Sequence, residues 1–331
     1  MNDEDIIIYN ELPLTEAFIP TRLFHREGQL RELERCLKPV LYNKLPENVF
    51  LAGSTGTGKT LVARWILESY FRDRSVYINC WKYRSTHDVL REILHSLGII
   101  IHGREKTSDL IKKLEKILKQ KKLIICLDEV DQLKESTVLY VLARNVCGLI
   151  LISNNIHSLM NLDSRIRSSL ALTEIRFPDY KTDEMYDILK DRVLFSFRSG
   201  TLKDELIRIT ALMSKGDARV GLETLRRAGR KAEDKGLRHV TIREIREASK
   251  EAKRLKKSYI LSKLNEHQQV IYEILEKKMR MTSGELYKEY CKLVSKPVVA
   301  RAYRNYMKKM VNLGLVEVLG SGRWRSYKII V

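Results

Sequence analysis

Short apolar runs alternate with stretches of helical period along the first 180 residues of the chain. Apolar runs of this kind are typical of strands buried on both faces of a parallel sheet, and apolar residues three or four positions apart predict helices between them. Five strands are predicted, at 49–52, 75–80, 123–127, 149–153 and 170–177. The alternation predicts an α/β fold with a doubly wound parallel sheet, whose functional sites lie at the carboxyl ends of the strands.

The region from 181 to 262 has helical periodicity and no strand pattern. Four helices are predicted there, at 182–195, 202–214, 217–235 and 242–261. Thr241 and Glu244 have the spacing of a capping box, which favours the start of the last helix after Thr241. We therefore expect an all-helical domain at 181–262, following an α/β domain at 1–180.

The pattern changes again in the last part of the chain. Three helices are predicted, at 267–278, 283–293 and 298–312. Two strands follow, at 315–319 and 324–331, joined by a turn that contains Gly320 and Gly322. Three helices and a hairpin in this order are typical of a winged helix, a variant of the helix-turn-helix. A third domain, a winged helix, is therefore expected at 263–331.

The sequence Gly53–Thr60, GSTGTGKT, lies between the first predicted strand and a helical pattern. A glycine-rich turn in that context is a phosphate-binding loop, because backbone N–H groups and the positive end of the helix dipole meet there. Its lysine reaches the β- and γ-phosphates, and the next hydroxyl can bind Mg²⁺. The alternative is a glycine-rich turn with a chance Lys-Thr. The residues predicted to bind ATP or ADP are Gly53, Thr55, Gly56, Thr57, Gly58, Lys59 and Thr60.

Two acidic residues end the predicted strand at 123–127. Asp128 follows at least four apolar residues, the pattern in which a carboxylate holds Mg²⁺, here together with Thr60. Glu129 is the candidate general base for the water that attacks the γ-phosphate. An acidic surface turn is the alternative interpretation, and the upstream phosphate loop favours the catalytic one. The pair therefore predicts ATP hydrolysis as well as ATP binding.

Four more polar residues are candidates for the nucleotide site. Asn154 ends the next strand and is expected to orient the attacking water, although asparagine is also common in turns. Arg219 begins a helix of the second domain and is expected to bind the γ-phosphate, with a solvated helix-start arginine as the alternative. Arg165 and Arg167 are candidates for a finger that reaches the nucleotide of a neighbouring subunit, or are surface residues only.

Composition restricts the class of protein. The chain has 44% hydrophobic and 31% charged residues, which is ordinary for a globular protein, and no apolar run approaches the ~18 residues of a membrane span. The acidic N-terminus does not resemble a signal peptide. Five scattered cysteines without a CxxC pair favour reduced thiols and no structural zinc. We therefore expect a cytoplasmic protein without a membrane partner.

The formal net charge of +19 indicates a polyanionic partner. Nucleic acid is the most common partner of this kind, and association with the nucleoid would follow from it. An acidic membrane surface, or the lysine enrichment of a thermophile, is the alternative source of such a charge.

The predicted helix at 298–312 has an apolar side and a basic side. The apolar residues expected to face a core are Val299, Tyr303, Tyr306, Met310 and Leu313. Arginine and asparagine read guanine and adenine edges in the major groove, and the turn after the helix would carry charge near phosphate or the minor groove. The predicted DNA-binding residues are Arg301, Arg304, Asn305, Lys308, Arg323 and Arg325. A solvated basic face on a domain that contacts proteins is the alternative.

These motifs together resemble the archaeal members of the origin-recognition-complex/cell-division-cycle family of replication initiators. The resemblance covers nearly the whole chain and includes GSTGTGKT, LDEVD from Leu127, FPDY from Phe177, GDAR from Gly216 and GELY from Gly284. It implies an AAA+ fold, which is a P-loop parallel sheet with a helical lid, followed by a C-terminal winged helix. Asp179 departs from the family, which usually has a second proline there.

The resemblance also implies roles for single residues: Lys59 and Thr60 at nucleotide and Mg²⁺, Asp128 and Glu129 as Walker B, Asn154 as sensor 1 and Arg219 as sensor 2. It implies a slow ATPase that recognises origin duplex DNA through the winged helix and a helical insertion within about 82–106. The replicative helicase and other initiator paralogues are the implied protein partners. A nucleotide-gated regulator, or a clamp-loader-like AAA+ subunit, with a winged helix that contacts proteins is the alternative.

Overall fold

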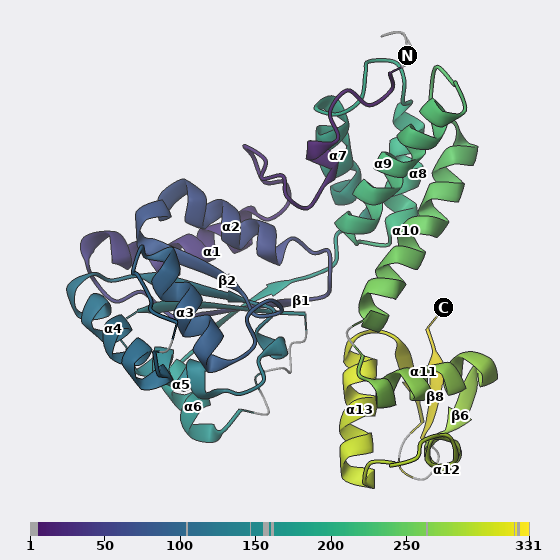
Figure 1. Ribbon diagram of the computed structural model, residues 1–331. Helices are drawn as coiled ribbons and strands as arrows, with labels where there is room; N and C mark the ends of the chain where they lie inside the picture. The colour runs from purple at the N-terminus through teal and green to yellow at the C-terminus, as the bar shows by residue number, and fades with distance from the viewer. Residues whose placement is uncertain are drawn as a thin grey trace. The chain divides into compact units, whose positions relative to one another are not determined.

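The structure is a computed structural model, shown in Figure 1, and it describes residues 6–103, 105–145, 147–154, 159, 162–262, 264–320, 322 and 325–330. The chain divides into two compact units, Met1–Ser249 and Lys250–Val331. None of the helices in the described ranges is both long and apolar enough to cross a membrane. The domain limits expected at 180/181 and 262/263 stay predictions, because the division into units tests neither of them.

Five parallel strands form the centre of the first unit, in the order β2-β3-β4-β1-β5. Their bounds are β1 (Val49–Gly53), β2 (Ser75–Asn79), β3 (Ile124–Asp128), β4 (Gly148–Ser153) and β5 (Thr173–Phe177). The predicted parallel sheet is confirmed, although the strand expected from Leu170 begins three residues later. Because β1 pairs with β4 and β4 with β3, the carboxyl ends of these three strands are adjacent.

Helices cover both faces of this sheet (Figure 1). On one face, α1 (Glu27–Leu37) and α2 (Lys59–Tyr70) close a core that contains Leu51 and Ile124. On the other face lie α3 (Thr86–Ser96), α4 (Thr107–Gln120), α5 (Thr137–Arg144) and α6 (Ser164–Leu170). The two cores use alternate residues of the same strands, as expected of a sheet buried on both sides.

The remaining helices of the first unit form the predicted all-helical region: α7 (Thr182–Leu194), α8 (Asp204–Ser214), α9 (Ala218–Asp234) and the beginning of α10 (Ile242–Ser262). The N-terminal segment packs into their core, and its short helix η2 (Leu12–Leu14) lies against α7 and α9. The Glu233 carboxylate accepts hydrogen bonds from the backbone N–H groups of Ile7 and Ile8, at 2.8 and 2.9 Å. These contacts tie the N-terminal segment to α9.

The second unit contains the predicted three helices and hairpin, with one more strand. The elements are α11 (Glu266–Lys278), β6 (Arg280–Thr282), α12 (Ser283–Leu293), α13 (Ala300–Asn312), β7 (Val316–Leu319) and β8 (Ser326–Ile329). The strands form an antiparallel sheet in the order β6-β8-β7. Thr282 and Glu285 make a capping box at the start of α12. Sequence analysis missed β6 because its three residues are a strand only through pairing with β8.

The core side of α13 differs from the prediction at one end. Tyr303 and Met310 are buried as expected, and Met307 is buried between them. Val299, predicted to face the core, is 72% exposed, because it is the N-cap residue and has an extended backbone before the first helical turn. The prediction was wrong there because the helical spacing was extended one residue too far.

Candidate functional site

The phosphate-binding loop joins β1 to α2, as its strand and helix context predicts. Gly56 and Gly58 have φ angles of +77° and +89°, which favour glycine. Space excludes a side chain as well: a Cβ atom at Gly56 would lie 1.9 Å from Asp217 Oδ1, and one at Gly58 would lie 2.6 Å from the Tyr180 hydroxyl. The loop is therefore in close contact with the start of the helical region.

Lys59 is the first residue of α2 and is only 4% exposed. Its ammonium group donates to the carbonyl oxygens of Gly53 at 2.9 Å and Ser54 at 2.6 Å. Burial, reinforced by the nearby Arg219 guanidinium and opposed by Asp128, lowers the pKa of Lys59 to about 8. The positive charge is thus held inside the loop, where a phosphate group would replace a carbonyl oxygen as its partner.

The loop contains three more residues with hydroxyl groups before Lys59, and these are Ser54, Thr55 and Thr57. Thr57 is fully buried, and its hydroxyl donates to the Ser54 carbonyl oxygen at 2.9 Å, which closes the turn. Thr55 lies at the turn and is partly exposed. The Ser54 hydroxyl donates to the Asp179 carboxylate, so the residue that departs from the family pattern is bonded to the loop.

Asp128 ends β3 and is 3% exposed. The Thr60 hydroxyl donates to its Oδ2 at 2.8 Å, the Tyr77 hydroxyl donates to the same oxygen at 2.7 Å, and the Glu129 N–H donates to Oδ1 at 2.8 Å. Burial and the Asp128 charge raise the pKa of the Tyr77 phenol well above its usual range. The structure therefore brings together Thr60 and Asp128, the two residues predicted to hold magnesium.

This donor set fits Mg²⁺ bound together with nucleotide. Among the residues that the structure describes, no group of three or more His, Cys, Asp or Glu side chains could hold a metal. Magnesium in nucleotide sites is commonly held by one or two protein oxygens, phosphate oxygens and water, and not by a protein cage. A hydroxyl and a carboxylate at the edge of a phosphate loop are what that arrangement requires.

The two residues predicted to act on the attacking water end neighbouring strands. Glu129 follows Asp128 in the left-handed conformation, with φ 52° and ψ 45°, a backbone strain of about 1 kcal/mol that is common at functional sites. Asn154 follows β4 and lines the same pocket as Gly58 and Lys59. The Ser153 hydroxyl donates to Asp131 at 2.8 Å and so ties the end of β4 to the segment after β3.

Helix α9 begins directly on the phosphate loop. The Ala218 N–H donates to the Gly56 carbonyl oxygen at 3.1 Å, and Asp217 caps the helix by accepting from the Arg219 N–H at 2.9 Å. The Arg219 side chain lines the pocket and pairs with Glu16 of the N-terminal segment, with 3.2 Å between Nε and Oε1. The predicted γ-phosphate residue therefore lies at the loop, with a carboxylate as its partner.

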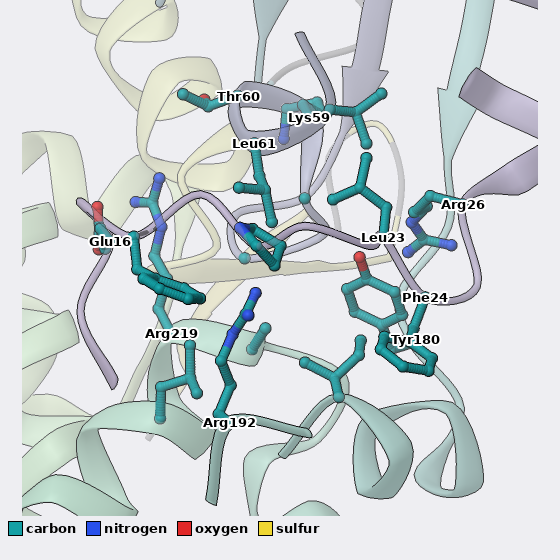
Figure 2. Close-up of a pocket in the computed structure, with 18 of the residues that line it drawn as sticks. Glu16, Leu23, Phe24, Arg26, Lys59, Thr60, Leu61, Tyr180, Arg192 and Arg219 are labelled. Atoms are coloured by element: carbon teal, nitrogen blue, oxygen red, sulfur yellow. Dashed lines mark ion pairs between the residues drawn. The ribbon is translucent and has the colours of Figure 1, made fainter. Parts of the chain in front are cut away.

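Figure 2 shows residues of the N-terminal segment, the phosphate loop and α7 and α9 around one pocket. Arg26, not predicted, is 3% exposed and donates to the carbonyl oxygens of Thr57 at 3.0 Å and Pro178 at 2.6 Å. Its guanidinium stacks on the Tyr180 ring, 3.7 Å from the centroid. Arg26 thus joins the loop to the connection between β5 and α7.

A second buried arginine in the pocket was also missed. Arg192 of α7 lies over the Phe18 ring, 4.8 Å from its centroid, and pairs with Asp191 at 3.3 Å. Burial lowers the pKa of Arg192. The sequence held one signal: Arg192 follows the buried Met185 and Leu189 at spacings of four and three, which puts a charge on the apolar side of a helix.

The candidate finger residues lie apart from this pocket. Arg165 and Arg167 are both exposed on α6, and neither belongs to the pocket lining. The structure of one chain therefore brings neither residue to its own phosphate loop, and a role towards a neighbouring subunit stays a prediction.

The second unit presents the predicted basic side of α13. The exposed residues of this side are Arg301, Arg304, Asn305 and Lys308. Arg304 Nε donates to the Ala300 carbonyl oxygen at 3.1 Å, one turn earlier in the helix. Arg325, before β8, is exposed as well, whereas Arg323 lies outside the described residues. The face is polar, positively charged and open to solvent.

The chain is similar to known proteins over the region that contains the phosphate loop and over the helical region that follows it. A family model described as an AAA domain matches residues 44–173, and one described as a Cdc6 AAA+ ATPase-type lid domain matches residues 186–250. The ORC1-type DNA replication protein 1 of Sulfurisphaera tokodaii is 31% identical, over 97% of this chain and 89% of that protein. The protein of the same name from Sulfolobus acidocaldarius is 32% identical, over 96% and 88%.

Solved structures agree with these matches. The Aeropyrum pernix ORC1 protein in complex with DNA has a TM-score of 0.76 at 28% identity, covering 99% of this chain and 94% of that one. Cdc6p from Pyrobaculum aerophilum has a TM-score of 0.68 at 25% identity, covering 98% and 94%. The chain therefore belongs to the family of ORC1-type DNA replication proteins, as an AAA+ ATPase with a Cdc6-type lid.

Proposed function

We propose that the protein is a slowly hydrolysing, ATP-dependent initiator whose bound nucleotide controls its binding to origin duplex DNA. The proposal rests on the contact between α9 and the phosphate loop. The N–H of Ala218, the first residue of α9, donates to the Gly56 carbonyl oxygen at 3.1 Å. A nucleotide that contacts both the loop and Arg219 has a different affinity for each position of the helical region that carries Arg219. This difference in affinity is what a nucleotide switch requires.

In the nucleotide site, Lys59 and the loop N–H groups hold the phosphates. Thr60 and Asp128 hold Mg²⁺, which neutralises phosphate charge when bound. Glu129 takes the proton of the attacking water, Asn154 orients that water, and Arg219 contacts the γ-phosphate. The buried positions of Lys59 and Asp128 support these roles because electrostatic interactions are stronger away from bulk water.

For DNA, the proposal uses the basic side of α13 in the major groove and Arg323 and Arg325 near the backbone. Support comes from the exposure of Arg301 and Arg304 and from the A. pernix ORC1 protein, whose structure is a complex with DNA. A second DNA contact is proposed for the insertion at about 82–106, as the resemblance to the replication initiators implies.

The protein partners belong to the proposal as well. The replicative helicase and other initiator paralogues are the partners that membership of an initiator family favours, and a nucleoid location follows from binding to DNA. Pull-down of the helicase by the ATP-bound and ADP-bound forms tests this part, with an Arg219→Ala variant for comparison. If the unsubstituted protein and this variant recover equal amounts of helicase, nucleotide control is contradicted.

The central test compares an origin duplex with a random duplex of equal length, at physiological salt, with ATP and with ADP. We expect tighter binding to the origin, by at least about tenfold, and a difference between the two nucleotides. Equal binding to both duplexes would remove origin recognition from the proposal. Equal binding with both nucleotides would remove the switch.

A nucleotide-gated regulator or clamp-loader-like subunit is the second candidate function. Leu293 and Val299, on either side of the loop between α12 and α13, are 65% and 72% exposed, and exposed apolar residues favour a protein contact. Substituting both with serine would then weaken a protein complex and leave DNA affinity unchanged. Hydrolysis that does not depend on protein concentration or subunit ratio would count against the clamp-loader form, in which Arg165 or Arg167 acts in trans.

A further inference from the structure

Both oxygens of the Asp128 carboxylate accept hydrogen bonds. The Glu129 N–H donates to Oδ1 at 2.8 Å, and the hydroxyls of Thr60 and Tyr77 donate to Oδ2 at 2.8 and 2.7 Å. Because an ionised carboxylate has about four acceptor positions, three donors leave room for a further ligand. Donors on both oxygens also oppose rotation of the group, so the remaining acceptor position keeps one direction.

Tyr77 reaches this carboxylate from a different strand. It lies in β2, where the register pairs Tyr77 with Cys126 and Asn79 with Asp128 of β3. The ring is partly buried against the core that α2 closes, and the hydroxyl extends from there to Asp128. A phenylalanine would keep the ring in this packing and remove the hydroxyl alone.

The three donors differ in what nucleotide binding does to them. The Thr60 hydroxyl is itself a proposed ligand of Mg²⁺, and Glu129 carries the proposed base. Tyr77 has neither role and does not belong to the lining of the pocket. Its bond to Asp128 can therefore persist while the metal and the phosphates enter and leave.

We propose that Tyr77 is a positioning residue for the metal site, whose hydroxyl orients Asp128 before Mg²⁺ arrives. The inference rests on the proposed function, in which Thr60 and Asp128 hold Mg²⁺. Residues that orient a metal ligand through one hydrogen bond typically contribute 10- to 100-fold to metal affinity. The carboxylate is ordered when the protein folds, and this ordering does not have to accompany binding.

The test uses the full chain and the Tyr77→Phe variant. Binding of a fluorescent ATP analogue is measured in EDTA and then at increasing MgCl₂. We expect that the Mg²⁺ concentration that gives half of the change in analogue binding rises about tenfold in Tyr77→Phe. The affinity for the analogue in EDTA should stay within about twofold of that of the unsubstituted protein. Displacement of bound Mn²⁺, followed by its paramagnetic resonance, gives a second readout that does not depend on hydrolysis.

Tyr186→Phe is the matched control. The Tyr186 hydroxyl also donates to a carboxylate, that of Asp204, at 2.6 Å, and neither residue lines the pocket. This variant loses the same chemical bond at another place in the same unit. We expect its Mg²⁺ response to equal that of the unsubstituted protein.

Two results for Tyr77→Phe would overturn the proposal. One is an unchanged Mg²⁺ midpoint. The other is an equal loss of affinity in EDTA and in Mg²⁺, which would mean that the hydroxyl contributes to the stability of the fold and not to the metal site. Asp128→Asn separates this failure from failure of the proposed function. If Asp128→Asn keeps the full Mg²⁺ response, the magnesium site is wrong and the role of Tyr77 falls with it. If Asp128→Asn loses the response and Tyr77→Phe keeps it, only the role of Tyr77 is wrong.

Discussion

The two proposed binding regions of this protein hold their charged side chains in different ways. In the first unit, Arg26, Lys59 and Asp128 are 3%, 4% and 3% exposed, and each is hydrogen-bonded to neighbouring residues. In the second unit, Arg301 and Arg304 are exposed on a helix. The first region holds its charges in buried hydrogen bonds, whereas the second presents its cations to solvent.

This difference predicts that salt affects the binding of nucleotide and of DNA to different degrees. Buried, hydrogen-bonded charges recognise a ligand of fixed geometry, and salt screens them weakly. Exposed arginines and lysines bind a polyanion largely by releasing its counterions, so their contribution falls steeply with salt. Nucleotide binding should therefore be nearly independent of salt, and DNA binding strongly dependent on it.

The largest effect is expected for Lys59→Ala. It removes a buried cation at the phosphates and should weaken ATP binding roughly 100-fold, equivalent to about 3 kcal/mol. Calorimetric titration measures this, with the exposed Lys44→Ala as the control that keeps full affinity. An equal, small loss in both variants would mean that the buried position of Lys59 contributes nothing specific to ATP binding.

The combined Arg301→Ala and Arg304→Ala substitution tests the other side of the comparison. A base contact contributes about 1–3 kcal/mol, so DNA affinity should fall at least tenfold, and the salt dependence should become shallower. Binding isotherms at several salt concentrations measure both quantities. The control removes two exposed lysines of α11, Lys277→Ala with Lys278→Ala. If the control matches the test variant, general charge explains the binding and α13 does not read DNA.

Gly56→Ala tests the contact between loop and lid. The added Cβ would lie 1.9 Å from Asp217 Oδ1 at a φ of +77°, so the start of α9 must move. We expect unfolding free energy to fall by about 2 kcal/mol and ATP affinity by several-fold, as measured by urea denaturation and titration. Gly28→Ala, in α1 with open space around it, should be neutral or stabilising by up to about 1 kcal/mol. Unchanged stability in Gly56→Ala would show that the contact is loose.

The smallest effect is expected for Glu16→Gln, which releases Arg219 from its carboxylate partner. The two side chains are 67% and 38% exposed, so the pair is worth at most about 1 kcal/mol. The preference for ATP over ADP should rise about two- to threefold, because Arg219 no longer exchanges a partner to reach the γ-phosphate. Competition between the two nucleotides measures the ratio, with Glu32→Gln, which removes the charge from the exposed pair of Glu32 with Arg35, as the control. A lower preference would contradict the role of Arg219.

The sequence by itself determined the features whose residues are neighbours along the chain. Gly53–Thr60 follows one strand and opens one helix, Asp128 and Glu129 end another strand, and Thr241 with Glu244 caps α10. Strand, turn, helix and cap are decided by backbone conformation and bonds over a few residues, so spacing alone reveals them. These local patterns were also enough to indicate the family that the comparisons confirm.

Only the tertiary structure decided which distant side chains meet at the site. Tyr77 reaches Asp128 across 51 positions, and Arg26 reaches Pro178 across 152. The strand β6 forms only by pairing with β8, and the exposure of Val299 depends on where α13 begins. Such contacts leave no regular spacing in the sequence, because they depend on how separate helices and strands pack and not on the local period of any one of them.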